Sequence, residues 1–88
     1  MILSSNYEII EIADEYLAVP VGEMAKRKKD VYSFSKAAAF LLNKMKKDIS
    51  KQDLIDSLLS DYDIDLSTAQ KDVEVFISTL LEYEIIDL

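Results

Sequence analysis

The chain has 88 residues, of which 50% are hydrophobic, and its 17 acidic and 10 basic residues give a net charge of −7. It contains no cysteine and no histidine. These residues are the ones most often used for zinc binding, nucleophilic attack and proton transfer near neutral pH, so the composition argues against an enzyme and against a metal site. The acidic balance argues against general binding to nucleic acid or anionic lipid, because phosphate is bound by Lys and Arg.

No apolar run approaches the roughly 18 residues that a membrane span needs. A length of 88 residues suits one domain over residues 1–88. The absence of cysteine fits a reducing compartment. We therefore expect one soluble, cytoplasmic domain that uses no cofactor and does not bind membranes.

The first third of the chain alternates apolar and polar residues with a period of two, which is typical of strands. The pattern predicts a strand over Tyr7–Ile12, a tight turn at Ala13 and Asp14, and an antiparallel strand over residues 15–21. Pro20 should lie near the end of that strand. Residues 22–30 follow as a connector, and residues 31–34 predict a short third strand at the edge of a three-stranded meander.

From residue 35 the apolar period becomes that of helices. Ser35 is the predicted N-cap of a first helix that ends near residue 48. Its expected buried face is Phe34, Ala37, Ala38, Leu41, Leu42 and Met45. A motif similar to a capping box at Ser50 opens a second helix, which buries Leu54, Ile55, Leu58 and Leu59.

Residues 61–66 form a turn, and a second capping box at Ser67 opens the longest helix, which ends near residue 82. Its apolar stripe is Ala69, Val73, Phe76, Ile77, Leu80 and Leu81. Residues 84–88 form either a last short strand or an extended segment. The fold class is therefore α+β, with an N-terminal three-stranded antiparallel sheet followed by three helices.

The connector carries a basic run in an otherwise acidic chain: Lys26, Arg27, Lys28 and Lys29. The run is either a solvated loop or an electrostatic lure for a partner segment rich in Asp and Glu. Such steering acts mainly on the association rate and weakens with salt.

The third strand presents unpaired backbone groups at the edge of the predicted sheet. Three roles stay open for this edge. It can accept an incoming peptide strand, it can pair with a second copy of the chain in a homodimer, or the basic run can guard it against aggregation. The apolar stripe of the last helix leaves a similar choice, because Val73 and Leu80 suit a core whereas Phe76 and Ile77 could line a groove beside the strand.

The helical half also fits a winged helix, in which the last helix would enter a DNA major groove. That helix offers Lys71 against Asp72, Glu74 and Glu82, so its surface would repel phosphate. We therefore rank a DNA-binding regulator below a peptide-binding protein.

The order of these elements and several segments resemble the PqqD-like proteins, which are named for protein D of pyrroloquinoline quinone biosynthesis and are also called precursor-peptide recognition elements. The matching segments are residues 31–35, 37–38, 41–42, 49–50 and 72–80. The chain departs from the family pattern at four places: Phe34-Ser35 replaces Leu-Asn, Leu42 replaces Trp, and Lys47 and Glu84 each replace Gly.

The resemblance implies a winged-helix-like domain without chemistry of its own. Such a domain captures the leader segment of a ribosomally made precursor peptide and presents the rest to a modifying enzyme, often a radical S-adenosylmethionine maturase or a cyclase. In the family the leader adds a strand beside the third strand and packs against the third helix. The corresponding positions here are Val31, Tyr32, Ser33 and Phe34 on the strand, and Asp72, Val73, Phe76, Ile77 and Leu80 on the helix.

Overall fold

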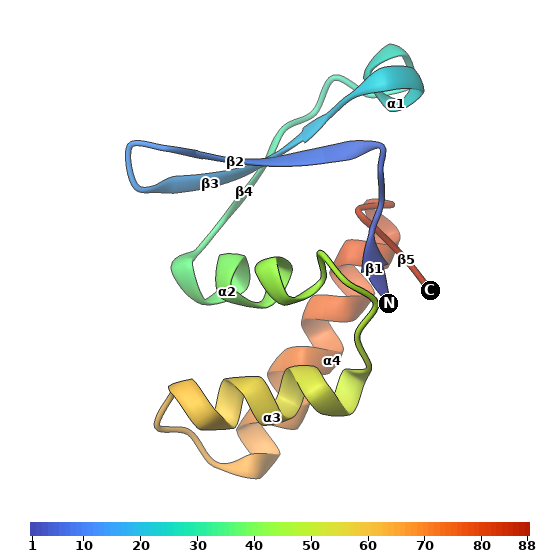
Figure 1. Cartoon of the computed structure of the whole chain (residues 1–88). Coiled ribbons are helices and arrows are strands. Elements are labelled where there is room, and N and C mark those ends of the chain that lie inside the picture. Colours follow the sequence, from blue (N-terminus) through green and yellow to red (C-terminus); the bar gives the residue numbers. More distant parts are fainter.

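A three-stranded antiparallel sheet lies at one end of the molecule and three longer helices lie at the other in the computed structural model, which describes residues 1–88 (Figure 1). The strands are β1 (Ile2–Leu3), β2 (Tyr7–Ile12), β3 (Glu15–Pro20), β4 (Tyr32–Phe34) and β5 (Ile86–Asp87). The helices are α1 (Gly22–Arg27), α2 (Lys36–Lys44), α3 (Lys51–Asp61) and α4 (Leu66–Glu82). The predicted α+β class is confirmed.

Strands β2, β3 and β4 form an antiparallel meander in that order. Ala13 and Asp14 join β2 to β3 with positive φ angles of 48° and 68°, as in the type I′ turns whose twist matches that of a hairpin. Pro20 lies opposite Tyr7 at the end of β3, where the missing N–H costs least. Because β4 pairs only with β3, the predicted edge strand is confirmed.

The connector between β3 and β4 is not irregular throughout, because its first residues form helix α1. Gly22, with a φ of 58°, turns the chain after β3. Met24 is the only buried residue of α1, with 2% of its surface exposed, and its carbonyl accepts the Lys28 N–H at 2.8 Å. One buried residue in six creates no apolar period, which is why the sequence pattern did not predict this helix.

Helices α2 and α3 begin at the predicted caps. The hydroxyls of Ser35 and Ser50 each accept a hydrogen bond from the backbone N–H three residues on, at 3.2 and 3.0 Å. Two details of α2 differ from the prediction. The helix ends at Lys44. Ala37 is exposed whereas Ala39 is buried, because α2 packs between the sheet and α3 and so turns the face with Ala39 inward (Figure 1).

Helix α4 begins two residues earlier than predicted. Its N-cap is Asp65, whose carboxylate accepts the Thr68 N–H at 2.7 Å, so the prediction of a cap at Ser67 is wrong. The hydrogen bond from Thr68 also lowers the pKa of the Asp65 carboxyl. An anionic cap is favoured here because it lies at the positive end of the helix dipole.

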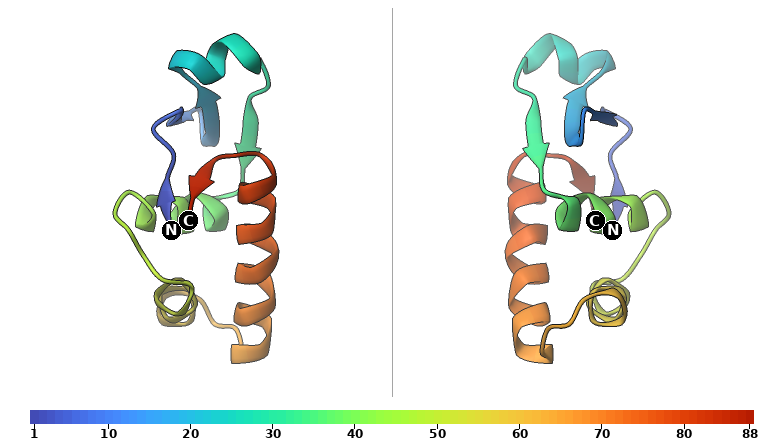
Figure 2. Two further views of the ribbon diagram at one scale, coloured as in Figure 1. Left: turned by 90° about the vertical axis from the view of Figure 1, so that its right-hand side faces the viewer. Right: turned by 90° about the vertical axis from the view of Figure 1, so that its left-hand side faces the viewer.

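Two short strands at the ends of the chain form a second antiparallel sheet. Ile2 pairs with Asp87, and Leu3 pairs with Ile86. The last strand was one of two predicted alternatives for residues 84–88, whereas β1 was not predicted. The pairing brings the two termini side by side (Figure 2).

Fourteen buried side chains form one hydrophobic cluster that joins the sheet to the helices. Tyr7 and Ala18 enter it from the sheet, and Met24 enters it from α1. Its most completely buried large members are Leu42, Met45, Val73, Leu54, Leu80 and Ile85. No helix combines the length and the apolar composition needed to cross a membrane.

Candidate functional site

A groove of about 610 Å³ runs between the free edge of β4 and the exposed face of α4. Most of its lining is hydrophobic. The lining residues are Val31, Tyr32, Ser33, Phe34, Ser35, Ala38, Lys71, Asp72, Val75, Phe76, Thr79 and Tyr83. The groove is therefore made by Val31, the whole of β4, the start of α2 and one face of the last helix.

The outer edge of β4 has no hydrogen-bonding partner in the chain. Its ladder bonds go to β3 on the other side, and no other backbone or side-chain hydrogen bond involves residues 31–34. Backbone N–H and C=O groups at such an edge can pair with a further extended chain. This edge forms one complete side of the groove.

Two aromatic pairs hold β4 against α4. Tyr32 stacks on Tyr83 with ring centroids 4.3 Å apart and an interplanar angle of 11°. Phe34 meets Phe76 edge to face, with centroids 6.4 Å apart. Such pairs contribute about 0.5–1.5 kcal/mol beyond the area they bury. They fix the separation of strand and helix, and so the width of the groove.

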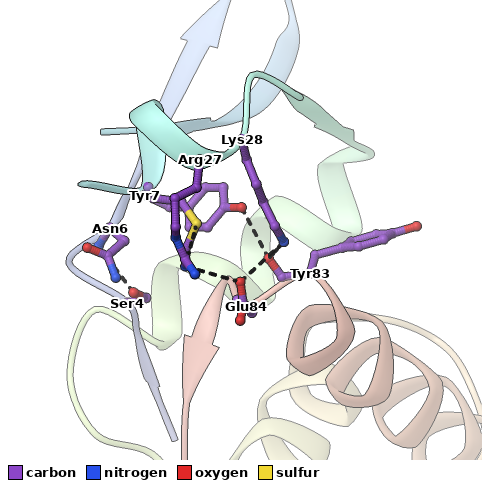
Figure 3. A network of polar contacts seen from close by, with 8 residues as sticks. Ser4, Asn6, Tyr7, Arg27, Lys28, Tyr83 and Glu84 are labelled. Atoms are coloured by element: carbon purple, nitrogen blue, oxygen red, sulfur yellow. Dashed lines mark hydrogen bonds and ion pairs between the residues drawn. The ribbon is translucent and has the colours of Figure 1, made fainter. Parts of the chain in front are cut away.

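A polar network secures the Tyr83 end of the groove (Figure 3). The Tyr7 hydroxyl donates to the Tyr83 carbonyl at 3.1 Å, and the Lys28 ammonium donates to the same oxygen at 3.4 Å. Burial raises the pKa of the Tyr7 hydroxyl, which keeps it protonated as the donor. The Glu84 carboxylate lies 3.3 Å from Lys28 and 3.6 Å from Arg27.

The end of α4 places Tyr83 through a Schellman motif. The Ile85 N–H donates to the Leu80 carbonyl at 2.9 Å, and the Glu84 N–H donates to the Leu81 carbonyl at 3.1 Å. Leu80 and Ile85 are both fully buried, which supplies the hydrophobic contact that accompanies this motif. Glu84 has the left-handed φ of 61° that the motif requires. The chain turn after α4 is therefore tied to the core and, through the polar network, to α1.

The structure divides the residues predicted to bind a peptide into two groups. Six of them line the groove: Val31, Tyr32, Ser33, Phe34, Asp72 and Phe76. Val73 and Leu80 are fully buried and Ile77 packs against the core, so these three do not line it. Binding by the first six stays a prediction.

The other half of the groove lining lies outside the set predicted to bind a peptide, although the ring of Tyr83 suited either a peptide anchor or the core from the sequence. These residues are Ser35, Ala38, Lys71, Val75, Thr79 and Tyr83. A signal was present for four of these residues, because Lys71, Val75, Thr79 and Tyr83 recur every four positions and so share one face of α4. That row is mostly polar or exposed. The row therefore shares no residue with the apolar stripe of α4.

The basic run is largely engaged within the molecule. Lys26 lies 3.2 Å from a carboxylate of α1, and Arg27 and Lys28 pair with Glu84. Only Lys29 makes no ion pair. Electrostatic steering by the run stays a prediction, and Lys29 is the member of the run whose charge is not paired within the molecule.

Comparison with known proteins gives a family and a fold. The family model described as coenzyme PQQ synthesis protein D (PqqD) matches residues 23–86. No curated protein matches the chain. A structure of TbiB1 in complex with the TbiA(beta) leader peptide has a TM-score of 0.81 and 15% identity, over 99% of this chain and 95% of that one.

A structure of lasso peptide synthetase B1 complexed with the leader peptide has a TM-score of 0.76 and 16% identity, over 92% of this chain and 89% of that one. Both likenesses show the fold, which is winged-helix-like. Because the family model spans most of the sequence, from α1 to β5, this chain belongs to the PqqD family.

Proposed function

We propose that this protein is a non-catalytic adaptor that binds the leader segment of a ribosomally synthesised precursor peptide. The observation that carries the proposal is the unpaired edge of β4 beside an apolar groove. Membership of the PqqD family and the likeness to two proteins solved with leader peptides support it.

In this proposal the leader enters the groove as an extended strand and pairs with the backbone of Tyr32, Ser33 and Phe34. Successive side chains of a strand point to opposite faces, so every second leader residue would face α4. Those residues would meet the aromatic pairs and the side chains of Asp72 and Val75. Hydrogen bonds between the two backbones would supply affinity, and contacts of the leader side chains with the groove wall would supply sequence specificity.

The proposed role includes a second partner. A leader held at β4 leaves the remainder of the precursor free, so a peptide-modifying enzyme, such as a radical S-adenosylmethionine maturase or a cyclase, would act on it. The adaptor itself would use no cofactor and work in the cytoplasm as one domain.

A titration of the ¹⁵N-labelled protein with a synthetic leader of the precursor encoded beside its gene tests the proposal. We expect the amide signals of Tyr32, Ser33 and Phe34 to shift, because each lies beside the added strand. Hydrogen exchange should slow at those N–H groups of β4 that point away from β3, since only these gain a new partner. Shifts confined to other regions would show that strand addition does not occur.

A matched pair of variants on α4 supplies the control. Val75 lines the groove and is 61% exposed, whereas Leu66 is 52% exposed on the same helix and lies outside it. Val75→Asp should weaken leader binding about tenfold or more, which corresponds to about 1.4 kcal/mol. Leu66→Asp should leave the affinity unchanged.

The same edge favours one other role, pairing of two copies through β4. Sedimentation of the protein alone at rising concentration separates the two proposals. An adaptor with a free edge stays monomeric, whereas pairing through β4 gives a dimer as the concentration rises. A DNA-binding role has no support from α4, where Asp72, Glu74 and Glu82 are all exposed.

A further inference from the structure

The three-stranded sheet has an outer face, on the side opposite the three longer helices (Figure 1). Successive residues of a strand point to opposite faces, so the register of the strands assigns each residue to one face. Tyr7, Ala18 and Tyr32 lie on the face that packs on the helices. The residues that alternate with them along the strands form the outer face.

Four aliphatic side chains lie together on this outer face. Ile10 and Leu17 are direct cross-strand partners. Ile12 and Val19 each follow one of these two by two residues on the same strand, so the four form one outer patch. None of the four belongs to the hydrophobic core or packs against it. Ile12 is 55% exposed, and the other three are half-buried.

The outer patch differs from the usual water-facing side of a sheet. An antiparallel sheet with one face on a core normally carries polar side chains on the other. Strand propensity does not account for the difference, because Thr has a high propensity and is polar. Apolar patches bordered by polar residues mark interaction sites. The outer patch is therefore a candidate contact surface for a partner.

The charges around the outer patch define that partner. The hairpin of β2 and β3 contains no Lys or Arg, and its four acidic residues are Glu8, Glu11, Asp14 and Glu15. Glu8 lies opposite Val19 and Glu15 lies opposite Ile12, so both carboxylates border the outer patch. Neither forms an ion pair within the molecule. A protein surface with Lys and Arg around an apolar centre is complementary to this arrangement.

A second copy of this chain does not have that complementary surface. Each copy carries a net charge of −7, and pairing of two outer patches would bring the acidic residues of both hairpins together with no basic residue of either hairpin between them. Juxtaposed like charges oppose association. An anionic membrane is disfavoured for the same reason, because it attracts basic segments.

The outer patch is continuous with the free edge of β4. Ser33 lies beside Leu17 on the outer face. A leader strand paired with β4 would extend this face by one strand, and every second leader residue would point outward next to Ser33. A protein docked on the outer patch would therefore lie beside the bound leader without entering the groove.

We propose that the outer face of the sheet is the docking surface for the peptide-modifying enzyme, which meets it with an apolar surface bordered by Lys and Arg. The inference rests on the proposed function and adds to it the surface and the charge of the second partner. The domain binds its two partners on opposite sides of one sheet. The leader fills the groove beside α4, and the enzyme contacts the outer patch.

The test uses the purified peptide-modifying enzyme encoded beside the gene of this protein, with the synthetic leader present at saturation. The double change Ile10→Thr with Leu17→Thr removes the centre of the outer patch and keeps residues that suit strands. Biolayer interferometry should show enzyme binding weakened at least tenfold, with the leader affinity unchanged. Leu66→Thr, at an exposed position of α4, is the control and should leave both affinities unchanged.

A reversal of charge tests the acidic border of the outer patch. Glu8→Lys with Glu15→Lys should slow association with the enzyme roughly tenfold at low salt. The difference from wild type should shrink as salt rises, because ions screen exposed charges. Asp61→Lys with Asp63→Lys makes the same change in net charge at exposed positions at the end of α3 and should slow association much less.

The outcomes separate the two proposals. If the wild-type protein does not bind the leader, the proposed function is wrong. If it binds the leader but the enzyme does not bind, or binds the Ile10→Thr, Leu17→Thr protein equally well, only the docking surface is wrongly assigned. Equal slowing by both charge reversals would overturn the role of Glu8 and Glu15. Dimerisation of the protein alone that the two Thr substitutions abolish would assign the outer patch to a second copy.

Discussion

Glu84 occupies a backbone conformation that favours glycine, with a φ of 61°. The resemblance to the PqqD-like proteins implies Gly at this position. A non-glycine residue in the left-handed region costs about 1–2 kcal/mol. In this chain the Glu84 carboxylate offsets part of that cost through its ion pairs with Arg27 and Lys28.

Two substitutions at this residue should therefore differ in effect. Glu84→Ala removes the ion pairs and keeps the strain, so it should lower the free energy of unfolding by up to about 1 kcal/mol. Glu84→Gly removes both and should be neutral or slightly stabilising. Urea denaturation of both variants measures the difference, and equal destabilisation by Ala and Gly would contradict it.

At the scale of elements, the start of α4 offers a test of which residue caps the helix. Asp65→Ala should lower the melting temperature by several degrees because the Thr68 N–H loses its acceptor. Ser67→Ala is the matched control and should change little, because the Ser67 hydroxyl makes no capping bond. A larger loss in Ser67→Ala would return the cap to the position predicted from the sequence.

The same cap predicts a pH dependence. The pKa of the Asp65 carboxyl is lowered from its usual 3.8 in the folded protein, so its contribution is complete above that value and is lost as pH falls through the folded pKa. The gap in melting temperature between wild type and Asp65→Ala should therefore narrow below about pH 4. Thermal denaturation across this pH range measures it.

Elements with local signals were predictable from the sequence. The hairpin follows from alternation around Ala13 and Asp14, and two helices follow from the Ser35 and Ser50 caps. By contrast, β1 has two residues and its partner β5 lies at the other end of the chain. Helix α1 has one buried residue, Met24, and so shows no apolar period in the sequence. Both β1 and α1 therefore depend on contacts that only the folded chain provides.

The elements that form the candidate site were predictable from the sequence, whereas the side of α4 that lines it was not. The edge strand and the facing helix follow from element order, since a short third strand precedes the helices. The side of α4 that faces β4 does not, because Val73 and Phe76 both belong to one broad apolar stripe. The rotation of α4 decides between them, and it places Val73 in the core and Phe76 in the groove.

At the scale of the whole molecule, one core connects every part of the fold from the sheet to β5. We therefore expect a single cooperative unfolding transition, with far-UV circular dichroism and tyrosine fluorescence giving the same urea midpoint. Leu42→Ala should lower the free energy of unfolding by about 2–5 kcal/mol, because Leu42 is fully buried.

Leu66→Ala is the control for this substitution. Leu66 is half exposed at the start of α4, so its loss should change the free energy of unfolding by less than about 0.5 kcal/mol. Separate midpoints for the two probes would show that the sheet and the helices unfold independently.

The pairing of β1 with β5 places the two ends of the chain next to each other. A host loop needs to open by only the spacing of two adjacent strands, about 5 Å, to take up such a fold. The insertion would replace the Met1 ammonium, which pairs with Asp48 at 2.7 Å. The groove lies on β4 and α4, away from that junction. An insertion at the two ends would therefore leave the groove unobstructed.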